Sequence, residues 1–308
     1  MGVIKRHDAA EIKQWWTTAP ALDENALRDG ILQLLSSIHE AASDDDWDSV
    51  QDHIRLYELG ESYCSEEPQL STYEFGRMDI DVMLAGNYIS RGEYSKAAEK
   101  IERCHSTYGA RMKRYADQGT TPRRASEVRY KFLLRLADLK WIAPAEWRDF
   151  LMTPETLLDE IHTTYGHIVA FLQANPGSHS NERSLMEGLA LCELVGLKMA
   201  LRYAPSRVPE LVRKFNEHYK DYLAVPPFHY KAVNAAAGDK SAYYWDFELA
   251  KLRVTPDAPA QDIYMCIELR SIAARNTFGD WRIQGLLRGW RREALTIVRE
   301  LQARKSKA

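Results

Sequence analysis

Two histidines in the segment 155–172 raise the question of a metal site. His162 and His167 lie five residues apart on a predicted helix, with Asp159 and Glu160 beside them. A helix turns about 100° per residue, so this spacing sends the two imidazoles to different faces, whereas a two-histidine zinc motif needs i, i+4 spacing. Glycine-rich phosphate loops, G-x-S-x-G, H-E-x-x-H and close Cys–His pairs are also absent from the sequence. We therefore expect no metal and no cofactor.

A second candidate for chemistry is the stretch RKFNEH, from Arg213 to His218. An arginine followed after four residues by a histidine resembles the signature of the HEPN domains, a family of helical ribonucleases. The resemblance implies that Arg213 holds a phosphate while His218 acts as general base. The stretch lacks the asparagine that commonly follows the arginine in that family. Whether the protein is an enzyme stays open at this point, and a role without catalysis is favoured.

Charge is distributed unevenly along the 308 residues, although the net charge is only −3. Residues 21–81 hold sixteen acidic and three basic side chains, whereas the segments 111–135 and 275–308 each carry a net charge of about +6. Such polarity has two interpretations: solvated surface charge with internal pairing, or two faces of opposite sign that meet a charged partner.

The acidic run between residues 44 and 48 suggests a partner protein with a basic surface. Its candidate binding residues are Asp44, Asp45, Asp46 and Asp48. The basic segments suggest nucleic acid instead, because they mix arginine and lysine with tyrosine, as phosphate contact and base stacking require. The candidate residues there are Arg111, Lys113, Arg114, Arg123 and Arg124. The isoelectric point near 6.3 argues against nucleic acid, which is kept as the alternative.

Aromatic side chains are concentrated in the stretch 241–252, SAYYWDFELAKL. Tyr243, Tyr244 and Trp245 could be buried in the core or could form a hot spot for a partner. The stretch resembles a helix of the helical immunity proteins, which neutralise DNase toxins delivered between bacteria, at Trp245, Phe247, Glu248 and Ala250. Asp246 departs from the small residue of that pattern. The resemblance implies a bacterial immunity protein that sterically blocks a toxin.

Helical periodicity dominates the chain, and no run of period-two alternation bounded by hairpin turns is present. Thr153 and Pro154 predict the start of one helix, as N-cap and first helical residue. Residues 184–201 are apolar almost all round, which is typical of a helix enclosed by others. We predict an all-α protein of roughly eleven to thirteen helices, with helical halves at 1–174 and 175–308 that could also form one continuous domain.

One stretch, residues 84–104, has the pattern of a helical hairpin and resembles a tetratricopeptide repeat. The matching residues are Leu84, Ala85, Tyr88, Gly92, Tyr94, Ala97 and Ile101. A weaker copy lies upstream, where Trp47, Val50, Ile54 and Tyr57 take the places of Tyr94, Ala97, Ile101 and Cys104. The resemblance covers about residues 31–110 and implies stacked helical hairpins in an irregular solenoid or bundle.

The four cysteines, Cys64, Cys104, Cys192 and Cys266, lie far apart in the sequence. They form no C-x-x-C motif, so we expect reduced and mostly buried thiols and a cytoplasmic protein. No apolar run is long enough for a membrane span, and the first residues lack an apolar signal core. The favoured function is therefore binding of another protein as adaptor, chaperone or inhibitor, with a nucleic-acid-associated protein or HEPN-like ribonuclease as the alternative.

Overall fold

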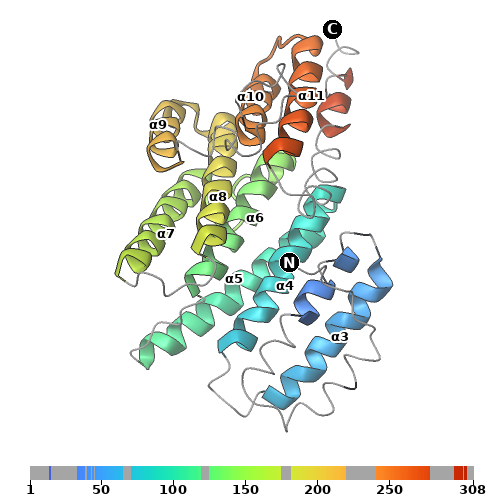
Figure 1. Cartoon of the computed structure of the whole chain (residues 1–308), viewed down its shortest axis with the longest axis vertical. Helices are drawn as coiled ribbons and strands as arrows, with labels where there is room; N and C mark the ends of the chain where they lie inside the picture. The colour runs from blue at the N-terminus through green and yellow to red at the C-terminus, as the bar shows by residue number, and fades with distance from the viewer. Residues whose placement is uncertain are drawn as a thin grey trace. The chain divides into compact units, whose positions relative to one another are not determined.

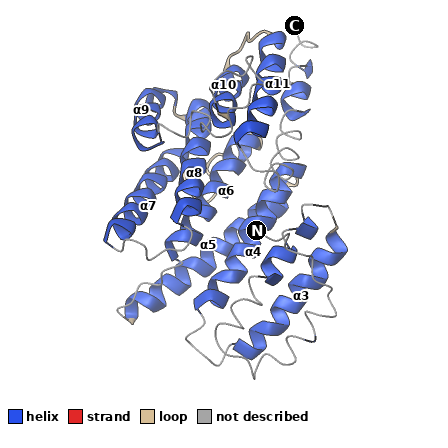
Figure 2. Ribbon diagram, in the orientation of Figure 1, coloured by secondary structure: helices blue, strands red, loops and turns tan. Residues whose placement is uncertain are grey.

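The computed structural model describes residues 33–38, 40–42, 46–64, 71–118, 125–174, 182–219, 241–277 and 295–300, together with positions 14, 44, 302 and 303. Within these ranges every regular element is a helix, and no strand occurs (Figure 2). The predicted all-α class is confirmed for this part of the chain, as is the predicted number of helices.

The delimited elements are α3 (Trp47–Cys64), α4 (Ser71–Arg91), α5 (Tyr94–Asp117), α6 (Ala125–Ile142), η2 (Ala145–Trp147), α7 (Pro154–Ala174), α8 (Glu182–Tyr203), η3 (Pro205–Arg207), α9 (Val208–Tyr219), α10 (Ala242–Val254) and α11 (Ala260–Thr277). Figure 1 shows their succession along the chain. Helical residues also occur at 33–42 and 295–303 in the described part of these segments.

The chain divides into two compact units. The first comprises residues 1–88 and 93–132, and the second comprises residues 89–92 and 133–308, so the boundary falls within α6. The predicted halves, 1–174 and 175–308, differ from these units, because α7 and α8 pack against each other across residue 175. That residues 1–174 and 175–308 fold as separate parts stays a prediction.

The predicted hairpin of α4 and α5 belongs to the first unit except for residues 89–92, the end of α4 and its turn, which are grouped with the second. Gly92 adopts a φ of 77° between the two helices, a left-handed conformation that only glycine adopts without strain. The Glu93 amide donates to the carbonyl of Tyr88 across this turn, at 2.9 Å. The small residues Ala85 and Ala97 are fully buried, which allows close approach of the helix backbones. The hairpin is therefore as predicted, while its membership of the tetratricopeptide family stays a prediction.

The upstream copy is also a pair of packed helices. Leu34, Ile38, Ala41 and Ala42 share one hydrophobic cluster with residues of α3 and α4, namely Val50, Ile54, Tyr57, Ile80 and Leu84. Trp47 at the start of α3 stacks on Tyr88 of α4, with ring centroids 5.3 Å apart and planes within 10°. The aromatic pair thus joins the two hairpins at the positions that the repeat pattern assigns to large side chains.

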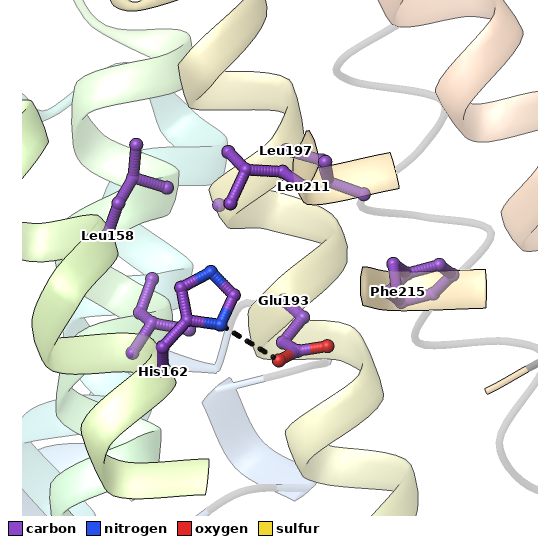
Figure 3. A pocket seen from close by; sticks show the side chains of 8 residues that line it. Leu158, His162, Glu193, Leu197, Leu211 and Phe215 are labelled. Atoms are coloured by element: carbon purple, nitrogen blue, oxygen red, sulfur yellow. Dashed lines mark ion pairs between the residues drawn. The ribbon is translucent and has the colours of Figure 1, made fainter. Parts of the chain in front are cut away.

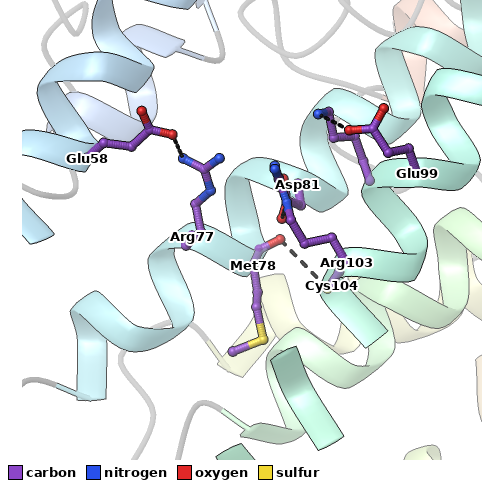
Figure 4. A network of polar contacts seen from close by, with 8 residues as sticks. Glu58, Arg77, Met78, Asp81, Glu99, Arg103 and Cys104 are labelled. Atoms are coloured by element: carbon purple, nitrogen blue, oxygen red, sulfur yellow. Dashed lines mark hydrogen bonds and ion pairs between the residues drawn. The ribbon is translucent and has the colours of Figure 1, made fainter. Parts of the chain in front are cut away.

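Two ion pairs of the first unit differ sharply in burial (Figure 4). Asp81 of α4 has a side chain only 2% exposed, and Arg103 of α5 donates to both of its oxygens, from Nε at 2.8 Å and from Nη2. The hydrogen bond to Asp81 raises the pKa of the Arg103 guanidinium. Arg77 instead pairs at 2.7 Å with Glu58 of α3, which is 49% exposed. Only the Asp81 carboxylate depends on its arginine for solvation.

The second unit is organised around α8. This helix packs against α7, α9 and α10 (Figure 1). Its residues 192–200 are buried without interruption. The predicted enclosed helix is therefore confirmed. Pro154 begins α7 as expected, and the Thr153 hydroxyl accepts a hydrogen bond from the Thr156 amide at 3.2 Å. Gly196 permits the contact with α7, because a Cβ there would lie 3.2 Å from Ile161.

Two long basic side chains hold the connection between α6 and α7. Arg202 of α8 donates from Nη1 to the carbonyls of Trp141 and Ala143, at 2.7 and 2.8 Å, and so caps the C-terminal end of α6. Lys140 is fully buried and donates to the carbonyls of Trp147, Arg148 and Phe150. Together they supply donors to backbone oxygens that the irregular connection leaves without helical partners.

We expect Arg103→Met to lower the free energy of unfolding by about 3 kcal/mol, because it leaves the Asp81 carboxylate buried without a counter-charge. Urea unfolding followed by circular dichroism measures this loss. The matched control is Arg77→Met, which removes the more exposed pair and should cost at most about 1 kcal/mol. Adding Asp81→Asn to Arg103→Met should restore part of the loss. If Arg103→Met and Arg77→Met lowered the free energy of unfolding equally, the Asp81 carboxylate would not depend on its arginine as described.

The buried Lys140 should make the free energy of unfolding depend on pH. Burial lowers the pKa of Lys140 from 10.5 to about 8, against a smaller opposing effect of Asp149. Between these values the unfolded chain holds a proton that the folded chain has released, so Lys140 makes the free energy of unfolding rise with pH. The limiting slope is about 1.4 kcal/mol per pH unit. Urea unfolding from pH 7.5 to 10 should show this slope in the difference between wild type and Lys140→Met.

The control for that titration is the exposed Lys113, whose replacement by Met should leave the pH dependence parallel to wild type. A constant difference between wild type and Lys140→Met across the window would show that burial of Lys140 does not shift its titration.

Candidate functional site

The only buried carboxylate on α8 with two histidine neighbours, among the described residues, is Glu193. Its side chain is 3% exposed. His162 of α7 lies with Nδ1 3.4 Å from Oε1, and His218 of α9 lies with Nδ1 3.4 Å from Oε2. The His218 ring also stacks on Tyr165, with centroids 4.2 Å apart. Three helices thus contribute to one group, with Glu193 from α8, His162 from α7 and His218 from α9.

A small hollow lies beside this group, between α7, α8 and α9 (Figure 3). The space that the centre of a water molecule can occupy in it is about 10 Å³. The walls are mainly aliphatic and aromatic, and the polar residues His162 and Glu193 form one side. One enclosed water needs roughly this much space, so the hollow has room for about one water molecule.

The two residues of the HEPN-like pattern point to different carboxylates. Arg213 is 62% exposed and pairs with Glu217 one turn along α9, at 2.7 Å, whereas His218 turns toward Glu193. His167 of α7 is exposed, so it lies on another face from His162, as the five-residue spacing predicts. In the described ranges no cluster of three or more His, Cys, Asp and Glu side chains is arranged to bind a metal ion.

The acidic candidates of the first unit have separate roles. Asp46 caps α3, because its carboxylate accepts from the Ser49 amide at 3.1 Å and from the Ser49 hydroxyl at 2.7 Å. Asp44 and Asp48 are exposed, and so is Asp52, which was not among the predicted residues and pairs with the exposed Arg55 at 3.2 Å. These three lie four residues apart, which places them along one side of α3 and the turn before it. Asp45 lies outside the described residues.

Much of the basic segment 111–135 is engaged inside the first unit or along its own helix. Lys131 pairs with Asp79 at 2.9 Å and with Glu127 at 3.2 Å, and Arg129 lies over the rings of Tyr108 and Phe132. Arg114 lies over the Tyr115 ring, whereas Lys113 is exposed and Arg111 is half-buried. Arg123 and Arg124 lie outside the described residues, as does most of the segment 275–308. The described contacts favour internal pairing for this segment.

The aromatic stretch forms the hairpin of α10 and α11. Tyr243 and Trp245 pack with Ala242, Ala273 and Ala274, and Trp245 also contacts the cluster around Leu249 and Ile263. Tyr244 is half-buried and meets Trp245 edge-on, with centroids 5.1 Å apart. All three aromatic residues are partly buried, and Tyr243 and Trp245 pack against the core of the hairpin, so their role in partner binding stays a prediction.

Asp246, in the middle of this stretch, is the counter-charge for two buried cations. Lys198 of α8 lies 2.9 Å from Oδ2, and Arg270 of α11 lies 2.9 Å from Oδ1, all three side chains being at most 7% exposed. Trp141 is fully buried beneath Lys198 and Arg253, and Arg253 in turn pairs with Glu300. The departure from the small residue of the immunity-like pattern therefore has a structural purpose.

The sequence analysis did not select Glu193, Lys198 or Asp246 as functional. A signal for the first two was present, because they are among the few charged residues in an otherwise apolar helix. Their partners could not be read from the sequence, since His162, His218 and Asp246 come from three other helices.

Three cysteines, Cys104, Cys192 and Cys266, are buried free thiols, as predicted. Burial raises the pKa of Cys266 to about 11 and the pKa values of Cys104 and Cys192 above their usual range, so none of them is a reactive thiolate. The side-chain surroundings of Cys64 lie outside the described residues.

Comparison of the chain with protein-family models, with curated proteins and with solved structures gives no match. The described helices include none that combines the length and the apolar character needed to cross a bilayer. The site must therefore be interpreted from its own chemistry.

We expect Asp246→Asn to lower the free energy of unfolding by about 3 kcal/mol or more, because Lys198 and Arg270 then remain buried without an anion. The exposed Asp257 provides the matched control, and Asp257→Asn should change stability by no more than about 0.5 kcal/mol. The double substitution Asp246→Asn and Lys198→Met should lower the free energy of unfolding by less than the sum of the two single substitutions. Additive losses in chemical unfolding would contradict a coupled cluster.

Proposed function

We propose that this protein acts by binding another protein with a basic surface, without catalysing a reaction. The observation that carries the proposal is the acidic stripe, defined as Asp44, Asp48 and Asp52, which are exposed along the start of α3. Exposed like charges at this spacing repel one another modestly, although Asp48 favours the helix dipole from the first turn of α3 and Asp52 pairs with Arg55 at 3.2 Å. A cationic partner would relieve that repulsion and gain electrostatic attraction on approach.

The distribution of the other carboxylates supports this interpretation. Asp79, Asp81 and Glu58 each pair with a basic residue of the same unit, and Asp46 caps α3. Part of the negative charge in the N-terminal third is thus used in ion pairs and in a helix cap. Asp48 has no ion pair within the described residues, which makes it the member of the stripe most suited to an external cation.

The specific form of the proposal is an immunity protein that covers the basic site of a toxic nuclease in the bacterial cytoplasm. Charge complementarity would then accelerate association, and steric cover would block the substrate of the toxin. This form rests on the resemblance of residues 241–252, on the acidic stripe and on an all-α scaffold.

The ribonuclease alternative rests on one observation, the contact of His218 with Glu193. A carboxylate near Nδ1 orients the imidazole of a histidine that transfers protons. In that role His218 would accept the proton of an RNA 2′-hydroxyl as its oxygen attacks the adjacent phosphorus, and the 5′-oxygen would leave with a proton from water. Arg213 is exposed but is paired with Glu217, so phosphate binding would first have to displace that carboxylate.

The test begins with proteins retained by the immobilised chain from an extract of its host. We expect a basic protein, whose purified form binds at least tenfold more weakly to a variant carrying Asp48→Lys and Asp52→Lys. The affinity should also fall between low and moderate salt, because exposed charges are screened. Calorimetric titration measures both effects.

The matched control reverses two exposed carboxylates of α5 in the same unit, Glu99→Lys and Glu102→Lys, and should bind as wild type does. Circular dichroism checks that both variants fold, since a lysine in the first turn of α3 costs up to about 1 kcal/mol. Equal binding by the two variants would overturn the acidic stripe as the binding surface. Cleavage of RNA that is lost in His218→Ala would establish the alternative instead.

A further inference from the structure

One side of α11 is exposed although its centre is apolar. Tyr264 is 50% exposed and Met265 is 51% exposed, and the polar residues Gln261 and Glu268 beside them are exposed as well. The spacing i, i+3, i+4, i+7 places these four residues on one side of the helix, called here the α11 face. This face lies in the second unit and the acidic stripe lies in the first, so the two surfaces share no residue.

The opposite side of α11 is packed into the second unit. Ile263 and Cys266 share a hydrophobic cluster with Leu249 of α10, and Arg270 pairs with the buried Asp246. Helices α10 and α11 lie side by side over much of their length (Figure 1). Because one side of α11 is held by these contacts, the α11 face is presented on a well-anchored helix.

The α11 face is complementary to a second copy of itself. In an antiparallel pair of helices centred between Tyr264 and Met265, each Tyr264 ring meets Met265 of the second copy, and each Gln261 meets Glu268. Methionine sulfur contacts aromatic rings favourably, and an amide N–H donates a charge-assisted hydrogen bond to a carboxylate. A two-fold axis forms each of these contacts twice.

The charge of the α11 face favours this antiparallel arrangement over a parallel one. A parallel pair would place Glu268 beside Glu268 of the second copy, and like charges in contact are costly. In the antiparallel pair the two carboxylates lie seven residues apart along the axis, which is about 10 Å at the rise of an α-helix. That separation is about one Debye length, so salt screens most of their repulsion.

We propose that a second copy of this chain packs against the α11 face and forms a two-fold symmetric dimer. Tyr264 and Met265 supply its apolar contact, and the Gln261–Glu268 hydrogen bonds fix its register. A contact centred on four side chains of each copy is small, so the association is weak and reversible. It does not depend on the proposed binding of a basic protein, because the acidic stripe takes no part in it.

Sedimentation equilibrium of the full chain from about 5 µM to about 500 µM tests the proposal. The average mass should rise with concentration from the 35.4 kDa of one chain toward twice that value. Met265→Glu places a charge at the centre of the contact and should keep the chain monomeric over the whole range. The matched control is Phe171→Glu on α7, where the phenylalanine is 38% exposed, and it should associate as wild type does.

Two substitutions at Gln261 test the register without altering the core. Because symmetry counts each contact twice, Gln261→Lys should tighten the association about fivefold by facing Glu268, and Gln261→Glu should weaken it about fivefold. A monomeric wild type at every concentration would overturn the proposal, and so would a Met265→Glu variant that associates normally. Equal effects of the two Gln261 variants would overturn the antiparallel register. Loss of partner binding in the acidic-stripe variants leaves the dimer intact, so the two proposals fail separately.

Discussion

The burial of charge on α8 is the constraint on which the second unit depends. Residues 192–200 of this helix are buried without interruption, yet they include Glu193 and Lys198. Two opposite charges five residues apart on a helix point in different directions, so they cannot neutralise each other. Each must therefore find its partner on a neighbouring helix: Glu193 meets the histidines of α7 and α9, and Lys198 meets Asp246 of α10.

This requirement ties the packing of the unit to specific residues. An apolar helix can slide or rotate against its neighbours with little penalty, whereas a buried ion pair is favourable only in one register. Asp246 also pairs with Arg270, so α8, α10 and α11 are positioned by the same carboxylate. The hollow beside Glu193 follows from the same arrangement, because Gly196 brings α7 close to α8 one turn away.

In the first unit the corresponding role belongs to Asp81 and Arg103, which join α4 and α5 beyond the turn at Gly92. Here the arginine remains partly exposed, so the pair lies at the edge of the core. The structural use of Asp46, Asp79 and Asp81 separates the acidic residues of this unit into two groups. Those of the first group cap α3 or form buried ion pairs, whereas the three residues of the acidic stripe are exposed, and Asp52 among them pairs with the exposed Arg55.

The sequence by itself determined the helical class, the α4–α5 hairpin and the enclosed character of α8. These features depend on local periodicity and on single residues such as Gly92 and Pro154, whose backbone preferences act without distant partners. The charge asymmetry was equally visible, but its division into structural and exposed carboxylates was not. Only the tertiary structure decided that division, together with the meeting of His162, Glu193 and His218 and the packing of Trp245 against the core of the α10–α11 hairpin. Those outcomes depend on which helix faces are brought together, and side chains distant in sequence carry no local signal of their partners.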